Sequence, residues 1–204
     1  MVVNPSLILG SASPRRAALL DRAGISYVVR TADIDEAAVA QAAMSELVGM
    51  PDLGTVVASI ALAKYHAIRG DTSTGLLLTA DTMVGCNGQI LGKPSGDTDV
   101  ARMLNQMSGS MLDIVTAVCR GPVDGGVDTQ QVATNVRLRD LSISDIAAYV
   151  ETGAGLDKAA ALALQSEANH FIERVDGCWS NVLGLPICVA TDQLCSVDLC
   201  GGWR

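Results

Sequence analysis

Apolar and polar positions alternate along the chain in a pattern typical of an α/β fold. The short apolar run at residues 7–9 predicts a buried strand, and the longer run at residues 76–80 predicts a central strand covered on both faces. Between these runs, apolar residues from position 56 to 63 repeat with helical spacing and predict a helix reaching about residue 69. We therefore expect a sheet with helices packed against it.

Further elements follow from the same periodicities and from turn residues. Strands are predicted at residues 27–29, 83–86, 89–91, 112–119, 132–138 and 171–172, and helices at residues 14–24, 36–48, 97–107, 142–150 and 186–199. The Asn87-Gly88 pair predicts a two-residue hairpin turn. An alanine- and leucine-rich segment follows Asp157-Lys158, and this pattern is typical of an ordinary helix.

The first predicted strand leads into a loop and a helix start. Gly10 permits a turn, Ser13 is a favourable N-cap, and Pro14 suits the first helical position. Free backbone N–H groups, hydroxyls and guanidinium groups would converge there, as a bound phosphate requires. The candidate phosphate ligands are Ser11, Ser13, Arg15 and Arg16. The alternative is an ordinary helix start with solvated arginines, and the loop matches neither a Walker motif nor Gly-x-Gly-x-x-Gly.

An acidic residue and two lysines are expected near this loop. Asp81 and Thr82 follow the predicted central strand, and ligands of open α/β sheets gather beyond the carboxyl ends of strands. The predicted hairpin brings Lys93 back toward Asp81. Lys64 lies in the second half of its predicted helix, where it either complements the helix dipole or reaches inward to a phosphate. Only three of the fourteen basic residues are lysines, which favours a specific use for each.

Composition narrows the class of ligand. The chain has 204 residues, enough for one domain, and a net charge of −8, which opposes extended binding to nucleic acid. Six cysteines form no Cys-x-x-Cys pair, and with two histidines a metal ion would be held mostly by carboxylate and substrate oxygens, favouring Mg²⁺ or Mn²⁺. Asp35 and Glu36 start a predicted helix, where they either stabilise its dipole or bind such a metal. No apolar run is long enough to span a bilayer, so we expect a cytoplasmic protein without membrane contact.

Five separated motifs together resemble the Maf family of nucleoside triphosphate pyrophosphatases. In chain order they are Ser11-Ala12-Ser13-Pro14-Arg15-Arg16, Ala80-Asp81-Thr82, Leu91-Gly92-Lys93-Pro94, Asp157-Lys158-Ala159 with Gln165, and Asn181-Val182-Leu183-Gly184-Leu185-Pro186. The resemblance implies one two-lobed α/β domain over residues 1–204. Such a domain has a long mixed β-sheet flanked by helices and a deep central cleft, similar to the inosine triphosphate pyrophosphatases. It also implies a homodimer that hydrolyses a nucleoside triphosphate to the monophosphate and pyrophosphate with a divalent cation.

The resemblance implies roles for individual residues as well. Asp81 would be the catalytic acid that activates water, and Glu36 and Asp81 would lie near the metal. The phosphate-binding residues would be Ser11, Ser13, Arg15, Arg16, Lys64 and Lys93. The residues that set substrate choice would be Arg15, Thr82 and Gln165, which look like the branch acting on dTTP and UTP. A glutamine amide can both donate to and accept from the imide edge of a pyrimidine, which suits that substrate.

Two departures from the family pattern bear on substrate choice. Ala160 and Ser166 stand where the family usually has glycines. If those glycines serve a positive φ or a close backbone approach, a Cβ would shift the loop that carries Gln165.

Three rival functions stand beside the leading hypothesis. A related branch acts on 7-methyl-GTP, but it generally has another residue after the acid and a glutamate at position 165. A non-catalytic, nucleotide-binding regulator of cell division is the second rival, and loss of Asp81 or Lys93 would have favoured it. A phosphomonoesterase with an aspartyl nucleophile is the third, and its Asp-x-Asp-x-Thr pattern is missing.

Overall fold

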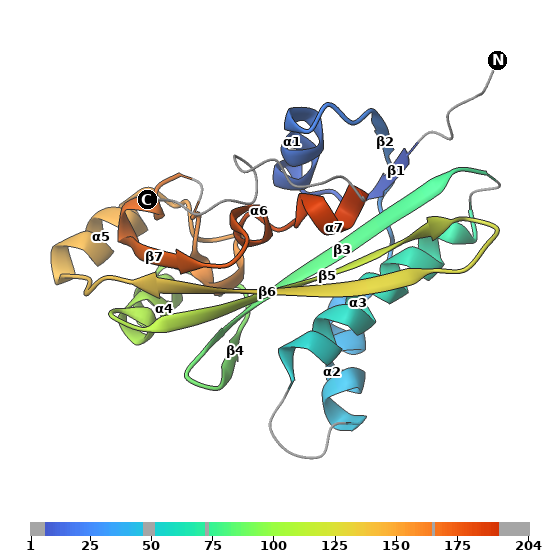
Figure 1. The fold of residues 1–204 in the computed structure, drawn as a ribbon. Helices are drawn as coiled ribbons and strands as arrows, with labels where there is room; N and C mark the ends of the chain where they lie inside the picture. Colours follow the sequence, from blue (N-terminus) through green and yellow to red (C-terminus); the bar gives the residue numbers. More distant parts are fainter. Residues whose placement is uncertain (1–6, 47–51, 72–73, 165, 192–204) are drawn as a thin grey trace.

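A computed structural model describes residues 7–46, 52–71, 74–164 and 166–191. Within these ranges seven strands form one mixed sheet in the order β2-β1-β3-β5-β6-β7, with β4 paired to β3 (Figure 1). The strands are β1 (Leu7–Gly10), β2 (Tyr27–Val29), β3 (Leu76–Cys86), β4 (Gln89–Leu91), β5 (Met111–Pro122), β6 (Asp128–Leu138) and β7 (Ile172–Asp176). β1 pairs in parallel with β2 and β3, and the other pairs are antiparallel.

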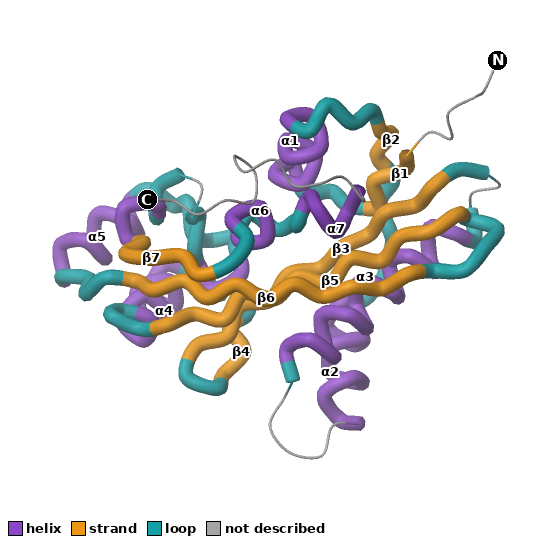
Figure 2. The backbone as a smooth tube through the Cα atoms, in the orientation of Figure 1, coloured by secondary structure: helices purple, strands orange, loops and turns teal. Residues whose placement is uncertain are grey.

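Helices cover both faces of the sheet, which confirms the predicted α/β class (Figure 2). They are α1 (Pro14–Arg22), α2 (Glu36–Glu46), α3 (Leu53–Arg69), α4 (Asp97–Met107), α5 (Ile143–Glu151), α6 (Trp179–Val182) and α7 (Ile187–Thr191), with 3₁₀ turns η1 (Ala159–Ala161) and η2 (Asn169–Phe171). Successive strand residues point to opposite faces. Ile8 and Leu77 therefore pack with α3, whereas Leu9 and Leu78 pack with α1 and α7.

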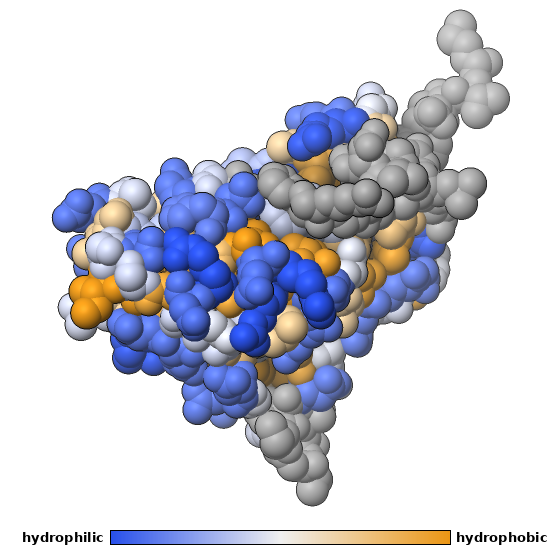
Figure 3. All heavy atoms as spheres, turned by 60° about the vertical axis from the view of Figure 1, so that its left-hand side comes forward, coloured by the Kyte–Doolittle hydropathy of each residue, from blue (hydrophilic) through white to orange (hydrophobic). Residues whose placement is uncertain are grey.

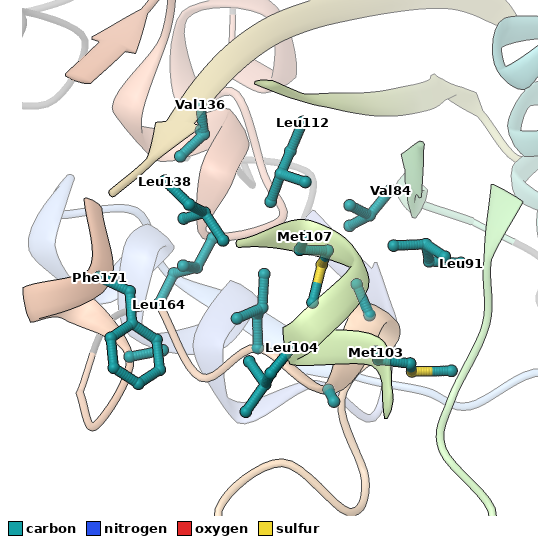
Figure 4. Close-up of a cluster of buried hydrophobic side chains, with 14 of the residues drawn as sticks. Val84, Leu91, Met103, Leu104, Met107, Leu112, Val136, Leu138, Leu164 and Phe171 are labelled. Atoms are coloured by element: carbon teal, nitrogen blue, oxygen red, sulfur yellow. The ribbon is translucent and has the colours of Figure 1, made fainter. Parts of the chain in front are cut away.

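Separate hydrophobic clusters give the molecule two lobes. In the first lobe α1, α3 and α7 pack on β1 and the first half of β3. In the second lobe α4, α5 and β7 pack on the other ends of the long strands, where Met107, Leu112, Leu138 and Phe171 lie close together (Figure 4). Each lobe buries its own set of side chains, while the strands β3 and β5 run through both (Figure 1).

Strand β3 is longer than predicted, and this corrects the placement of Asp81. The residue does not follow the strand but lies in its middle, because pairing with β5 continues through Asp81 to Cys86. The parallel pairing with β1 ends at Thr79, and the pairing with β4 begins only at Val84. Residues 80–83 thus pair with β5 alone among the described strands, and we call this segment the β3 gap. It opens at the carboxyl end of β1, where the sequence predicted a ligand.

Several local predictions are confirmed. The hairpin between β3 and β4 turns at Asn87 (φ 51°) and Gly88 (φ 76°), the left-handed pair that a two-residue turn requires. Helix α4 has the predicted bounds, and Pro14 occupies the first turn of α1. Figure 3 turns the left-hand side of Figure 1 toward the viewer. On this face polar side chains cover much of the surface, and apolar surface lies in separate patches. None of the helices in the described part of the chain is long and apolar enough to cross a membrane.

The segment after Asp157-Lys158 differs from its prediction. A single 3₁₀ turn, η1, replaces the expected helix, because Ala160 (φ 55°) and Ala161 (φ 58°) adopt left-handed backbone conformations that end helical hydrogen bonding. The predicted last helix is observed as α7, and its continuation to residue 199 lies outside the described residues.

Candidate active site

The loop that follows β1 is held tightly against its neighbours. A Cβ on Gly10 would lie 2.4 Å from Cγ2 of Thr79 and 2.7 Å from Cδ1 of Ile68, so glycine serves close packing here. Ser13 occupies the N-cap position of α1 with extended backbone, but its side chain makes no capping bond. Its backbone N–H instead donates to Oγ of Ser11 at 3.2 Å. The predicted side-chain cap is therefore wrong, although the helix starts where expected.

Arg16 is the centre of a buried polar network. Its Nε donates to the carbonyl of Gly184 at 2.7 Å, Nη1 to Oγ of Ser11 at 3.0 Å and Nη2 to Oγ1 of Thr82 at 3.1 Å. Thr82 lies directly across the sheet from Thr116, and their hydroxyls are 2.8 Å apart. Burial lowers the pKa of Arg16, while the Asp81 carboxylate raises it. A guanidinium bonded through three nitrogens is fixed in orientation, and it holds a positive charge beside the loop.

Lys64 is the centre of a second network. Its Nζ lies 2.7 Å from Oδ1 of Asp81 and 2.8 Å from Oε1 of Glu36. Of the two alternatives for Lys64, its side chain thus reaches inward, and there it contacts two carboxylates. The two acidic residues at the start of α2 also separate, because Asp35 accepts from the N–H of Ala38 as a helix cap while Glu36 turns toward Lys64.

The environment of Asp81 makes its carboxylate a stronger base than an ordinary aspartate. Burial raises its pKa, and the positive charges of Lys64 and Arg16 together with the Lys64 hydrogen bond oppose that rise. Burial is the larger effect, so the pKa of Asp81 lies above its usual range. A raised pKa in a carboxyl group beside fixed cationic side chains is typical of a residue that exchanges protons.

The two networks approach the β3 gap from opposite faces of the sheet. Asp81 points to the face covered by α3 and Lys64, and its neighbour Thr82 points to the face covered by α1 and Arg16. No strand closes the edge of the sheet between them within the described pairings. Arg16 and Asp81 influence each other's pKa across this opening. A ligand at the β3 gap can therefore touch both networks.

The remaining predicted site residues lie in different surroundings. Arg15 is half-buried, and the Asp157 carboxylate acts on its charge, so the segment 157–158 lies near the loop after β1. Lys158 pairs with Asp157. Lys93 is exposed two residues beyond β4, and no bond joins it to Asp81 in the part of the chain that is described. Gln165 lies outside the described residues.

Tyr149 fixes the segment that precedes Gln165. Its hydroxyl donates to the carbonyl of Ala161 at 2.8 Å and accepts from the N–H of Ala163 at 2.9 Å. The N–H of Ala160 donates to the carbonyl of Gly92 at 2.8 Å, which ties the same segment to the loop that carries Lys93. Ala160 is fully buried and has a positive φ, as expected for a position where the family uses glycine. The segment is therefore held in a backbone conformation that an alanine rarely adopts.

The donor set for a metal ion consists of two carboxylates. Glu36 and Asp81 converge on Lys64, and the described residues contain no group of three histidine, cysteine or acidic side chains that could hold a metal ion. One or two carboxylates completed by water and phosphate oxygens is the usual environment of Mg²⁺ in proteins that bind nucleotides. The residues present therefore fit a divalent cation that arrives with a phosphorylated ligand.

The sequence reasoning missed Thr116 and Tyr149, and it named Gly184 only as part of the fifth motif, without a contact. Thr116 contacts Thr82, the Gly184 carbonyl accepts from Arg16, and Tyr149 bridges two backbone groups. A polar residue inside the apolar run of β5 was a signal for Thr116, because a buried hydroxyl needs a partner. Nothing in the local sequence indicated the contacts of Gly184 and Tyr149, which depend on tertiary packing.

Fold and site together define an α/β protein with fixed cationic side chains beside a buried carboxylate, a class suited to phosphorylated ligands. The family described as Maf-like protein matches residues 6–197, and this chain belongs to that family. A curated relative from Geotalea uraniireducens (strain Rf4), named dTTP/UTP pyrophosphatase, is 37% identical over 95% of this chain and 96% of its own length. A relative of the same name from Anaeromyxobacter dehalogenans (strain 2CP-1 / ATCC BAA-258) is 41% identical over 90% of this chain and 89% of its own.

Among solved structures, a HAM1 protein from Coxiella burnetii matches with a TM-score of 0.42 and 11% identity over 80% of this chain and 90% of that chain. The resemblance to the Maf family that the five motifs carry is thus confirmed by the family match itself.

Proposed function

We propose that this protein is a nucleoside triphosphate pyrophosphatase that hydrolyses dTTP and UTP to the nucleoside monophosphate and pyrophosphate. The observation that carries the proposal is the meeting of the Arg16 network and the Lys64–Asp81 pair at the β3 gap. Cations on one side and a base on the other are what cleavage of a phosphoanhydride bond requires. The names of the curated relatives support the choice of substrate.

In this mechanism the phosphate chain lies along the loop after β1. Ser11, Ser13 and Arg15 bind phosphate oxygens, and Arg16 keeps its fixed position beside them. Lys64 and Lys93 neutralise the charge that develops on the pyrophosphate leaving group. Because Arg16 is already oriented by three hydrogen bonds, little reorganisation accompanies the reaction.

Asp81 takes the proton from the attacking water. In the free protein one carboxylate oxygen, Oδ1, accepts from Lys64, and in our proposal the second oxygen, Oδ2, receives the proton. Its raised pKa brings the carboxylate closer to the operating pH, where a general base is most effective. Glu36 and Asp81 would hold a divalent cation, which when bound polarises the phosphoryl oxygens and neutralises their charge.

Substrate choice is assigned to Arg15, Thr82 and Gln165, of which Thr82 acts through its bond to Arg16. Ala160 adopts the left-handed conformation that favours a glycine, so the segment before Gln165 tolerates the alanine. We further propose a cytoplasmic homodimer whose subunits each contain one two-lobed domain, and sedimentation velocity would measure the oligomeric state.

Product analysis tests the proposal. Purified protein is incubated with dTTP, UTP, GTP, 7-methyl-GTP or ATP and with Mg²⁺ or Mn²⁺, and the products are separated by chromatography. We expect dTMP or UMP with pyrophosphate, and at least a roughly thousandfold loss of turnover in Asp81→Asn with nucleotide binding kept. Asp113→Asn is a matched control, because Asp113 is an exposed residue of β5 that accepts from Asn135.

Other outcomes would assign the rival functions. Orthophosphate as the product indicates a phosphomonoesterase, and preferred cleavage of 7-methyl-GTP overturns the roles given to Thr82 and Gln165. Nucleotide binding without cleavage favours a non-catalytic regulator of cell division. Unchanged turnover in Asp81→Asn contradicts the mechanism.

A further inference from the structure

The ammonium group of Lys64 lies where the two acidic side chains of the site converge. Its Nζ is 2.7 Å from Oδ1 of Asp81 and 2.8 Å from Oε1 of Glu36. The side chains of Lys64 and Asp81 are only 11% and 12% exposed, so this pair is shielded from water, whereas Glu36 is 53% exposed. Lys64 therefore provides one positive charge that both carboxylates share in the free protein.

Binding of a divalent cation is unfavourable in this arrangement. Three cationic side chains, Arg15, Arg16 and Lys64, already act here together with the carboxylates of Glu36, Asp81 and Asp157. Adding a divalent ion would create an excess of positive charge in a partly buried region, where charge interactions are strong. It would also have to displace the ammonium from its short contacts with both carboxylates.

The triphosphate group of a nucleotide changes this balance. Its negative charges offer new partners to the flexible side chain of Lys64, which has a four-carbon stem and a mobile ammonium. We propose that Glu36 and Asp81 form a divalent-cation site that Lys64 closes in the free protein and that nucleotide opens by drawing the ammonium onto phosphate. This inference rests on the proposed function for the identity of the nucleotide.

The proposal makes cation binding and nucleotide binding depend on each other. Because the coupling between two ligands is reciprocal, nucleotide must raise the affinity for the cation as much as the cation raises the affinity for nucleotide. While Lys64 contacts both carboxylates, they hold no cation. No water is then ordered around a cation when substrate is absent. Lys64 thus acts as a gate on the cation site as well as a phosphate ligand.

Binding of Mn²⁺, followed by electron paramagnetic resonance of the free ion, tests the gate without any need for turnover. We expect weak binding of Mn²⁺ to the wild-type protein alone. With the non-hydrolysable analogue α,β-imido-dUTP, the complex of protein and analogue should bind Mn²⁺ about tenfold or more tightly than the analogue binds it without protein. Wild-type protein that binds Mn²⁺ equally well with and without the analogue overturns the proposal.

Substitution of Lys64 provides the second test. Lys64→Met removes the ammonium, and Lys64→Gln removes the charge while keeping a polar group beside Asp81. Folding of each variant is checked by thermal melting. Either folded variant should bind Mn²⁺ in the absence of nucleotide about tenfold more tightly than wild type, and the analogue should then add less. Adding Glu36→Gln to Lys64→Met should abolish the gain.

Arg102→Met is the matched control, because it removes a cation from an ion pair with Asp99 on the surface of α4. A folded Lys64 variant with the Mn²⁺ affinity of wild type overturns the gate. The same preparations are assayed for pyrophosphate release, so that the two proposals fail in different ways. Wild type that cleaves dTTP while Lys64→Met gains no Mn²⁺ affinity overturns the gate alone, and wild type that binds no nucleotide overturns the proposed function.

Discussion

Replacing Tyr149 with phenylalanine removes one oxygen atom from the second lobe and keeps its aromatic packing. The ring lies 5.4 Å from that of Phe171, and this contact survives the change. The lost hydroxyl donates to the carbonyl of Ala161 and accepts from the N–H of Ala163. Tyr149 is 3% exposed and both bonds are buried, so water cannot take the place of the hydroxyl.

The expected loss of stability follows from the two backbone groups left without a partner. Each buried donor or acceptor without a hydrogen bond costs about 1–3 kcal/mol. The easier burial of a phenyl ring offsets part of this, so we expect Tyr149→Phe to lower the free energy of unfolding by about 2–4 kcal/mol. For a domain of this size the melting temperature should fall by about 4–16 °C.

Urea and thermal denaturation of Tyr149→Phe beside Tyr65→Phe measures the effect. Tyr65 is also fully buried, but its hydroxyl makes one bond, to the carbonyl of Pro122 at 3.0 Å. The control should therefore lose only about 1–2 kcal/mol. If Tyr149→Phe costs no more than Tyr65→Phe, the hydroxyl does not hold the loop as described.

Three further predictions concern the site and the loop. Arg16→Lys should lower kcat/KM for dTTP about a hundredfold, because one ammonium cannot reach the three acceptors of the guanidinium; a value near wild type contradicts the fixed-arginine mechanism. Asp81→Asn should melt at a higher temperature than wild type at pH 8, because the pKa of Asp81 is raised by burial and its charged form is unfavourable in the fold. That advantage should shrink as the pH falls through the raised pKa and the wild-type carboxyl becomes protonated; a difference constant with pH opposes this assignment. Ala160→Gly should change the free energy of unfolding by no more than about 1 kcal/mol, because relief of left-handed strain offsets the buried methyl lost; urea denaturation showing a loss of more than about 2 kcal/mol would refute it.

The elements with strong local signals were predicted correctly. Pro14 defines the first turn of α1, Asn87-Gly88 defines the hairpin, and apolar spacing defines α4. These signals act over a few residues and need no knowledge of the rest of the chain. In the loop after β1 the structure joins three of the residues that the sequence grouped there, because Ser11 accepts from Arg16 and from the N–H of Ser13.

Predictions failed where pairing between distant segments decides the structure. An aspartate after an apolar run suggests the end of a strand, yet β3 continues through Asp81 because β5 pairs with it over eleven residues. The bond between Thr82 and Thr116 depends on that register, which the sequence does not reveal. Alanine gives no local sign of a positive φ, so the segment that forms η1 was predicted as ordinary helix.

The strands β3 and β5 bind the two lobes into one folding unit. Leu77 of β3 belongs to the core of the first lobe and Val84 of the same strand to that of the second, so no cut in the chain releases either lobe with a complete interior. Partial unfolding of one lobe would expose the strand ends that the other lobe needs, which favours a single cooperative transition. A nucleotide bound at the β3 gap, midway between the two cores, would accordingly protect the whole chain against heat and proteases.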